Sequence, residues 1–145
     1  MPTKQKGSTK KNVTQDTYIQ WYELMQLIRD FEFNAYRLVG QQKISGFCHV
    51  YSGEEAVVAG SMSAIEKDDK TITAYRDHGH ALGVGIDPKY VMAELFGKID
   101  GCTKGKGGSM HMFSKDLNFF GGHGIVGGCI PLGTGIGFAE KYKES

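Results

Sequence analysis

Three ionisable side chains follow one another at Arg76, Asp77 and His78, directly after the β-branched segment 71–75. A guanidinium group suits phosphate because its planar fork of N–H donors is always charged. Ligands of open α/β sheets gather at the carboxyl ends of strands, which is where Arg76 would lie. The residues alone leave a second interpretation open, because Arg76 and Asp77 could instead form a structural ion pair.

The histidines and cysteines do not form a metal-binding pattern. His78 and His80 could lie on one side of a strand, but no cysteine or acidic cluster accompanies them at metal-ligand spacing. The cysteines Cys48, Cys102 and Cys129 contain no C-x-x-C pair. We therefore expect free, buried thiols and no metal held by these residues.

Most of the 21 glycines lie in the segment 97–137, where backbone N–H groups could bind an anion. The nucleotide-binding patterns nevertheless fail. A P-loop needs a glycine five residues before Gly105-Lys106 and a serine or threonine after it, but Asp100 and Gly107 stand there. Gly133-x-Gly135-x-Gly137 lacks the dinucleotide-binding spacing. A generic phosphate-binding domain is therefore disfavoured.

Apolar residues spaced three and four apart predict a long helix over residues 17–39, because this spacing places them on one face. They are Trp21, Met25, Ile28, Phe31, Ala35 and Leu38. Thr14 or Asp16 can cap the start of this helix, and Gly40 stands where it would end. A capping box at Ser52-Gly53-Glu54-Glu55 predicts a second helix that runs to about Ile65.

The remaining elements complete an α/β pattern. Residues 71–75 predict a short buried strand. Asp87-Pro88 predicts the start of a helix over residues 89–96, which Gly97 would end. Segment 97–123 shows no helical or strand periodicity of its apolar residues. It contains too many apolar side chains for a free linker, so we expect a loop that packs against the rest of the domain. The small residues over 125–142 predict a helix that another backbone can approach closely and that needs tertiary support.

Length and composition indicate one soluble globular domain of 145 residues, with 40% hydrophobic and 23% charged residues. The net charge is +1, and the lysines of the first twelve residues leave the rest slightly acidic, which argues against a nucleic-acid-binding body. No apolar run approaches the ~18 residues of a membrane span, and no signal or transit sequence is evident. We expect a cytoplasmic protein with a basic flexible tail over 1–16 and a domain over 17–145.

Four stretches, in order and spacing, resemble the alpha subunit of the pyruvate dehydrogenase component of the pyruvate dehydrogenase complex. Members of this family use thiamine diphosphate and Mg²⁺ to decarboxylate pyruvate and pass the two-carbon unit to a lipoyl group. The resemblance implies part of a parallel-sheet thiamine-diphosphate-binding α/β fold with a long N-terminal helix, incomplete at its C-terminal end. The stretches are Phe47-Cys48-His49 ahead of Gly53-Glu54-Glu55-Ala56, then 73–79, 105–112, and 122–127 with Pro131-Leu132-Gly133.

The resemblance also implies roles for six residues. Tyr75 and Arg76 match residues that bind the diphosphate end of the cofactor. Gly124 and Val126 match residues that contact the aminopyrimidine ring through the backbone. The other two are Phe47, which matches an aromatic residue beside the cofactor, and His49, which matches a catalytic histidine on the substrate side. The resemblance gives His78, His111 and His123 no role beyond shaping the loop.

Other features of the family lie outside this sequence. Its Mg²⁺-binding Gly-Asp-Gly motif with a downstream asparagine does not occur here, so we expect the metal ligands beyond Ser145. The glutamate that activates the cofactor belongs to a beta subunit. The expected partners are that beta subunit, a second alpha subunit and the dihydrolipoyl acetyltransferase core, with pyruvate as substrate. We expect this chain to be inactive by itself and prone to self-association through an exposed sheet edge.

Two alternatives stay open. The acetoin and branched-chain 2-oxo acid dehydrogenases use the same cofactor, and the segment from Gly105 to His111 also suits the acetoin enzyme, whereas Phe47-Cys48-His49 and the segment from Tyr75 to His80 favour pyruvate. The other alternative is a non-catalytic subunit-interaction module, which the missing metal motif favours.

Overall fold

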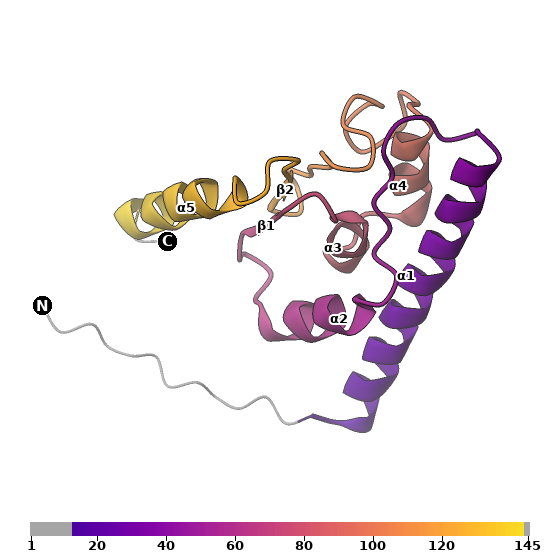
Figure 1. Ribbon diagram of the computed structural model, residues 1–145. Coiled ribbons are helices and arrows are strands. Elements are labelled where there is room, and N and C mark those ends of the chain that lie inside the picture. The colour runs from indigo at the N-terminus through magenta and orange to yellow at the C-terminus, as the bar shows by residue number, and fades with distance from the viewer. Residues whose placement is uncertain (1–12, 144–145) are drawn as a thin grey trace, which may run out of the picture.

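The computed structural model describes residues 13–143, so most of the predicted basic tail lies outside the described residues. Figure 1 shows the long helix α1 on one side of the molecule, the short helices and strands in the centre, and α5 extending from the opposite side. The elements are α1 (Gln15–Gly40), α2 (Glu55–Ala64), β1 (Thr71–Thr73), α3 (His78–Gly83), α4 (Pro88–Leu95), β2 (Phe119–Gly122) and α5 (Cys129–Lys143).

Helix α1 confirms the prediction from apolar spacing, and it begins two residues earlier than expected. Thr14 caps it: its Oγ1 accepts from the Thr17 N–H while the Thr17 hydroxyl accepts from the Thr14 N–H, each at 3.3 Å. The helix ends at Gly40, as predicted. Its buried face holds Ile28, Phe31, Ala35 and also Glu32, an acid in a core position that the apolar pattern did not include.

The predicted capping box of α2 is wrong, although the helix itself ends at Ala64, close to the prediction. No side chain caps its first turn. The Glu55 carboxylate instead accepts from the Gly53 N–H at 3.0 Å and from Arg29 Nε of α1. Gly53 has φ +96°, a left-handed turn that favours glycine. A contact with another helix therefore decides how this helix begins.

Helix α4 follows its sequence signals closely. Asp87 Oδ1 accepts from the Lys89 N–H at 2.9 Å, and Pro88 occupies the first turn, where its missing N–H has no partner to lose. Gly97, with φ +65°, follows the end of the helix. Helix α5 begins at Cys129 rather than Ile125, because residues 125–128 form a turn in which Gly127 has φ +82°.

The two strands are parallel neighbours, with Thr71 opposite Phe119 and Thr73 opposite Gly122. Parallel strands need a crossover connection, and α3, α4 and the segment 96–118 supply it. The predicted strand over 71–75 is shorter than expected, and β2 lies inside the segment predicted to be a loop. This small parallel sheet among helices is consistent with the α/β class.

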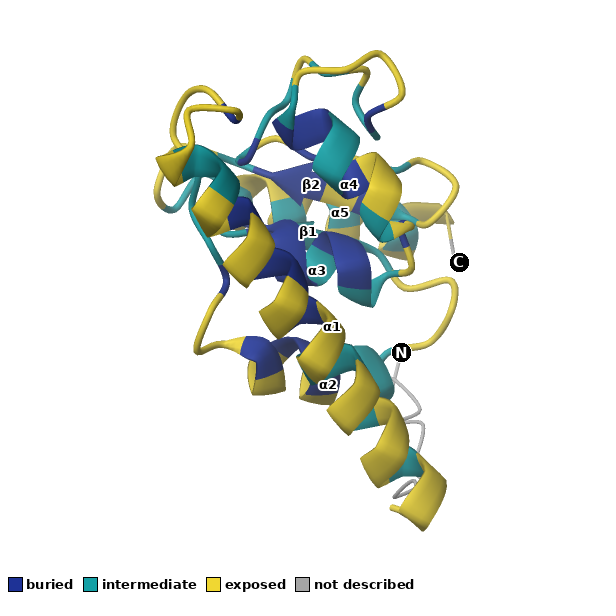
Figure 2. Cartoon of the chain, turned by 90° about the vertical axis from the view of Figure 1, so that its right-hand side faces the viewer, coloured by how far each residue is buried: buried dark blue, intermediate teal, exposed yellow. Residues whose placement is uncertain are grey.

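The core forms where α1, α2, α3, α4 and the strands meet, and Figure 2 shows its buried residues around β1, β2 and α3. Met112 and Phe119 are fully enclosed, which confirms that segment 97–123 packs, although Phe113, Leu117 and Phe120 stay exposed. The cysteines are free but half-buried rather than buried. Among residues 13–143, no helix is long and apolar enough to cross a membrane.

Candidate functional site

The carboxyl ends of β1 and β2 place two predicted site segments at one edge of the sheet. Tyr75 lies two residues after Thr73 of β1, and Gly124 lies two residues after Gly122, its partner on β2. The His123 N–H donates to the Ala74 carbonyl at 3.3 Å and continues the pairing beyond the strands. Tyr75-Arg76 and Gly124 are therefore neighbours where open α/β sheets bind ligands.

Four of the predicted residues form a continuous row of ring contacts. The rings of Phe47 and His49 stack with centroids 6.5 Å apart and an interplanar angle of 7°. His49 meets Tyr75 edge-on at 5.0 Å. The Arg76 guanidinium carbon lies 5.7 Å from the centre of the Tyr75 ring. The fold thus brings together residues 26 to 29 positions apart in the chain, with Phe47 80% exposed at one end of the row.

Arg76 does not form the ion pair with Asp77 that the sequence left open. Its Nη1 donates to the Val50 carbonyl, and its Nε lies 3.8 Å from Glu54 Oε1. Both side chains of this pair are partly exposed, and such pairs contribute little to stability. The guanidinium is therefore oriented by one backbone bond and weakly paired, so an incoming anion can compete for it.

Gly124 and Val126 lie in the turn between β2 and α5. A side chain on Gly124 would begin 3.2 Å from His111 Cε1, so a larger residue would press on this imidazole. Val126 is 81% exposed. The structure places Gly124 beside the end of β1, and neither Gly124 nor Val126 has a ring or hydrogen-bond contact with the row from Phe47 to Arg76. Any ligand that touched both groups would bridge the two strand ends.

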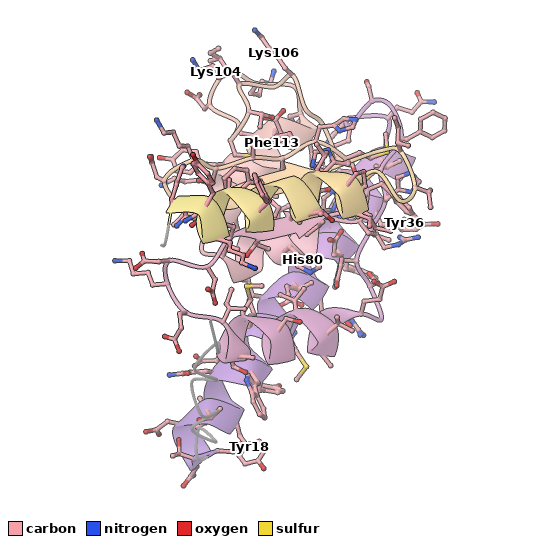
Figure 3. All side chains as sticks on the ribbon, turned by 90° about the vertical axis from the view of Figure 1, so that its left-hand side faces the viewer. Tyr18, Tyr36, His80, Lys104, Lys106 and Phe113 are labelled. Atoms are coloured by element: carbon pink, nitrogen blue, oxygen red, sulfur yellow. The ribbon has the colours of Figure 1, made fainter. Side chains whose placement is uncertain are left out.

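The glycine-rich segment 103–108 wraps around a carboxylate of the chain itself. The Glu94 oxygens accept from the backbone N–H groups of Thr103, Gly105, Gly107 and Gly108 at 2.8–3.1 Å. Burial by itself would raise the pKa of Glu94. The hydrogen bonds from these N–H groups and from the Thr103 side chain outweigh the effect of burial and lower the pKa of Glu94 below 4.5. These four N–H groups are therefore taken by an internal anion, whereas the exposed side chains of Lys104 and Lys106 on the same segment point outward (Figure 3).

A second buried acid lies at the start of α3. Asp77 Oδ2 accepts from the Met112 N–H at 3.0 Å, while Asp77 Oδ1 is buried without a partner. Burial is the main cause that raises the pKa of Asp77 to about 7. The hydrogen bond from the Met112 N–H and the nearby His78 act in the opposite direction and lower this pKa, but they do not offset burial. Gly122 leaves room for this carboxyl, because a Cβ there would overlap Asp77.

A third buried acid joins α1 to the site. Glu32 accepts from His78 Nδ1 at 2.9 Å, His78 Nε2 lies 2.7 Å from Ser109 Oγ, and Ser109 Oγ accepts from the His49 N–H at 2.9 Å. Sequence reasoning gave no role to Glu32, His78 or Ser109. The signal that could have found Glu32 is its place on the apolar face of α1, at spacings of one, three and four residues from other buried residues.

The residues present fit an amphiphilic anionic cofactor better than a metal. The exposed ring of Phe47 stands at one end of a row that ends at the Arg76 guanidinium, which suits a ligand that joins a ring to a diphosphate. Within residues 13–143, no three His, Cys, Asp or Glu side chains converge as metal ligands do. His78 and His80, the pair considered from the sequence, lie on the short helix α3 rather than on a strand.

Comparisons with known proteins identify the family of this chain. The family model described as dehydrogenase E1 component matches residues 23–145. The pyruvate dehydrogenase E1 component subunit alpha of Rickettsia felis is 52% identical over 130 residues, which are 90% of this chain and 40% of that protein. The subunit of the same name from Rhizobium meliloti is 51% identical over 137 residues, 94% of this chain and 39% of that protein.

A eukaryotic relative is equally similar. The mitochondrial subunit alpha of the same enzyme component from Dictyostelium discoideum is 51% identical over 140 residues, 96% of this chain and 37% of that protein. The chain thus spans about two fifths of the length of the curated relatives it matches. By the match over residues 23–145 and by these identities, this chain belongs to the dehydrogenase E1 component family.

Proposed function

We propose that this chain carries cofactor-binding residues of the alpha subunit of a thiamine-diphosphate-dependent pyruvate dehydrogenase. The whole enzyme would decarboxylate pyruvate and transfer the acetyl unit to a lipoyl group. The observation that carries the proposal is the row Phe47, His49, Tyr75 and Arg76 at the carboxyl edge of the sheet. Its support is the identity of about 50% to relatives named as pyruvate dehydrogenase subunits.

Arg76 and Tyr75 are proposed to bind the diphosphate end of the cofactor. Arg76 is held by the Val50 carbonyl and keeps part of its fork exposed, and its weak pair with Glu54 can yield to a doubly charged ligand. Gly124 and Val126 are proposed to contact the aminopyrimidine ring through their backbone. A main-chain contact explains why the position of Gly124, close to His111, suits a residue without a side chain.

His49 is proposed to face the substrate. Its imidazole is stacked on Phe47 and met edge-on by Tyr75, so two rings fix its plane, while its backbone N–H is fixed by Ser109. An imidazole held in this way can donate or accept a proton at a substrate oxygen. Thiamine diphosphate would supply the electron-accepting ring that decarboxylation of a 2-oxo acid requires.

The proposal extends to the metal and the partners. Mg²⁺ is proposed to be held by residues outside this sequence, because the Gly-Asp-Gly motif that binds it in the family does not occur here. A beta subunit, a second alpha subunit and the dihydrolipoyl acetyltransferase core are the proposed partners, and the proposed location is the cytoplasm. Helix α5 supports a role in assembly, because no side chain in its described residues is buried and Ile130, Phe138 and Tyr142 are largely exposed.

The test is an activity assay on an alpha subunit that contains this sequence at the length of its relatives, assembled with its beta subunit. Decarboxylation is measured with pyruvate, acetoin and branched 2-oxo acids, in the wild type, in His49→Ala and in Lys89→Ala as a matched exposed control. Pyruvate is expected to be preferred, with activity lost in His49→Ala alone. Clear preference for acetoin or a branched acid would overturn the substrate.

A second candidate function has one observation in its favour. The exposed apolar side chains of α5, with no metal cluster in the described part of the chain, would also suit a subunit-interaction module without catalysis. An assembly that forms normally but binds no thiamine diphosphate would support this alternative over the enzyme.

A further inference from the structure

Glu32, His78 and Ser109 form a hydrogen-bonded chain through the centre of the molecule. It runs from α1 through α3, which pack against each other (Figure 1), to the end of the glycine-rich segment. Glu32 and His78 are completely buried, and Ser109 is 6% exposed. Such a buried polar chain is favourable only when each member is satisfied, because unpaired buried groups are costly.

The protons of this chain can be assigned from the chemistry of its members. In the tautomer with its proton on Nδ1, His78 donates to a Glu32 carboxyl oxygen at 2.9 Å, so that both buried groups have a partner. With its proton on Nδ1, the ring accepts at Nε2 from the Ser109 hydroxyl. The Ser109 oxygen still has lone pairs, and one of them accepts from the His49 N–H. Glu32 thus orients the His78 ring, His78 orients the Ser109 hydroxyl, and Ser109 binds the backbone N–H of His49.

The order of an acid, a histidine and a serine is also that of hydrolase triads, but Ser109 is not placed to attack a substrate. It is almost fully enclosed and already accepts from His49. The nearby N–H groups of Gly107 and Gly108, which could have stabilised an oxyanion, donate to Glu94. Ser109 therefore acts as a hydrogen-bonding residue and not as a nucleophile.

We propose that Glu32, His78 and Ser109 are positioning residues that hold His49 in its place between Phe47 and Tyr75. The proposal deepens the proposed function, because it rests on His49 as the residue that faces the substrate. Ser109 is the member in direct contact with His49, so its hydroxyl is the point at which the chain can be cut without leaving a charge unpaired.

The first test measures amide hydrogen exchange of the folded protein and does not depend on activity. Ser109→Ala removes the acceptor, and exchange of the His49 amide is expected to rise roughly three- to tenfold, the factor for one ordinary hydrogen bond. Ser109→Thr keeps a hydroxyl and is expected to restore protection. Ser61→Ala, which removes an exposed hydroxyl from α2, is the matched control. Unchanged exchange at His49 in folded Ser109→Ala would overturn the proposal.

The second test uses the assembled enzyme with pyruvate. Misplacement of His49 in Ser109→Ala is expected to lower kcat by roughly ten- to hundredfold with a small change in KM, and Ser109→Thr is expected to recover most of kcat. A kcat equal to that of Ser61→Ala would overturn the positioning role. If His49→Ala retains full activity, the proposed function of His49 is wrong. If Ser109→Ala nevertheless increases hydrogen exchange at the His49 amide, the positioning of His49 by Glu32, His78 and Ser109 is still supported.

Discussion

Replacement of Asp77 by asparagine is expected to change how the stability of this fold depends on pH. Asp77 is fully buried, its Oδ2 accepts from the Met112 N–H, and its Oδ1 has no partner. Burial raises its pKa to about 7 from 3.8. Asparagine has nearly the same shape, can accept the same hydrogen bond through its carbonyl oxygen and cannot ionise. Asp77→Asn is therefore expected to be more stable than the wild type at pH 8.

The sign and size follow from proton binding. The folded state keeps the Asp77 proton up to about pH 7, whereas the unfolded chain loses it near pH 3.8, so rising pH opposes folding between these values. A difference of roughly 3 pKa units corresponds to about 4 kcal/mol in total. Of this, about 2.5 kcal/mol falls between pH 5 and pH 8. His78 and Glu32 face the same carboxyl with opposite effects and are unchanged in the variant.

The assay is urea unfolding of the wild type, Asp77→Asn and the exposed control Asp68→Asn at pH 5 and pH 8. The wild type and the control are expected to lose about 2.5 kcal/mol of unfolding free energy relative to Asp77→Asn over this interval. The carboxyl ¹³C resonance of Asp77 gives an independent readout and should titrate near pH 7. A titration near pH 4, or equal pH slopes for all three proteins, would refute the reasoning.

Three further outcomes are expected. Arg76→Ala should weaken thiamine diphosphate binding by the assembled enzyme by about 1.5–3 kcal/mol in calorimetry, whereas Lys89→Ala should not; unchanged affinity in folded Arg76→Ala contradicts the diphosphate role. Glu94→Gln should lower the unfolding free energy by about 2–4 kcal/mol at pH 7, because four N–H groups lose a charged acceptor. Since the pKa of Glu94 is lowered, this margin should persist above pH 4.5 and shrink as the pH falls through the folded pKa; a margin independent of pH argues against the internal anion. The polypeptide of residues 1–145 by itself should bind thiamine diphosphate weakly and show no pyruvate decarboxylation, so measurable turnover would disprove the need for residues from elsewhere.

The elements with local signals were predictable from the sequence. The apolar period and Thr14 determine α1, and Asp87-Pro88 determines the start of α4, because caps and amphipathic spacing act within one or two turns. The capping box of α2 was wrong because its decisive partner, Arg29, lies 26 residues away in the chain. A local motif could not contain that information.

Helix α3 and strand β2 were missed because tertiary contacts override their weak propensities. The sequence of α3 contains two glycines, and both are needed for packing: a Cβ on Gly79 would lie 2.6 Å from the Tyr51 ring, and one on Gly83 would lie 2.5 Å from Val58. Strand β2 is short and ends in two glycines, and it becomes a strand only by pairing with β1.

The candidate site was predictable only in part, because its residues are recognisable in the sequence but their positions depend on tertiary contacts. The resemblance supplied Phe47, His49, Tyr75 and Arg76, and the structure brings these four together. Their positions depend on hydrogen bonds that join segments 60 residues apart, such as the bond from His49 to Ser109. Residue types indicate which groups can do chemistry, but only the fold shows which groups orient them.

Three buried acids together explain how the aperiodic segment 103–112 is ordered. Glu94 accepts from four of its N–H groups, Glu32 reaches Ser109 through His78, and Asp77 accepts from Met112. A backbone without regular structure leaves N–H groups that must find partners, and a buried carboxylate needs donors. The same hydrogen bonds meet both needs at Glu94, whereas Asp77 accepts from Met112 through Oδ2 and keeps Oδ1 without a partner. The sequence pattern to seek in relatives is therefore an acid at a core position of an amphipathic helix, together with a long glycine-rich segment that has no period of its own.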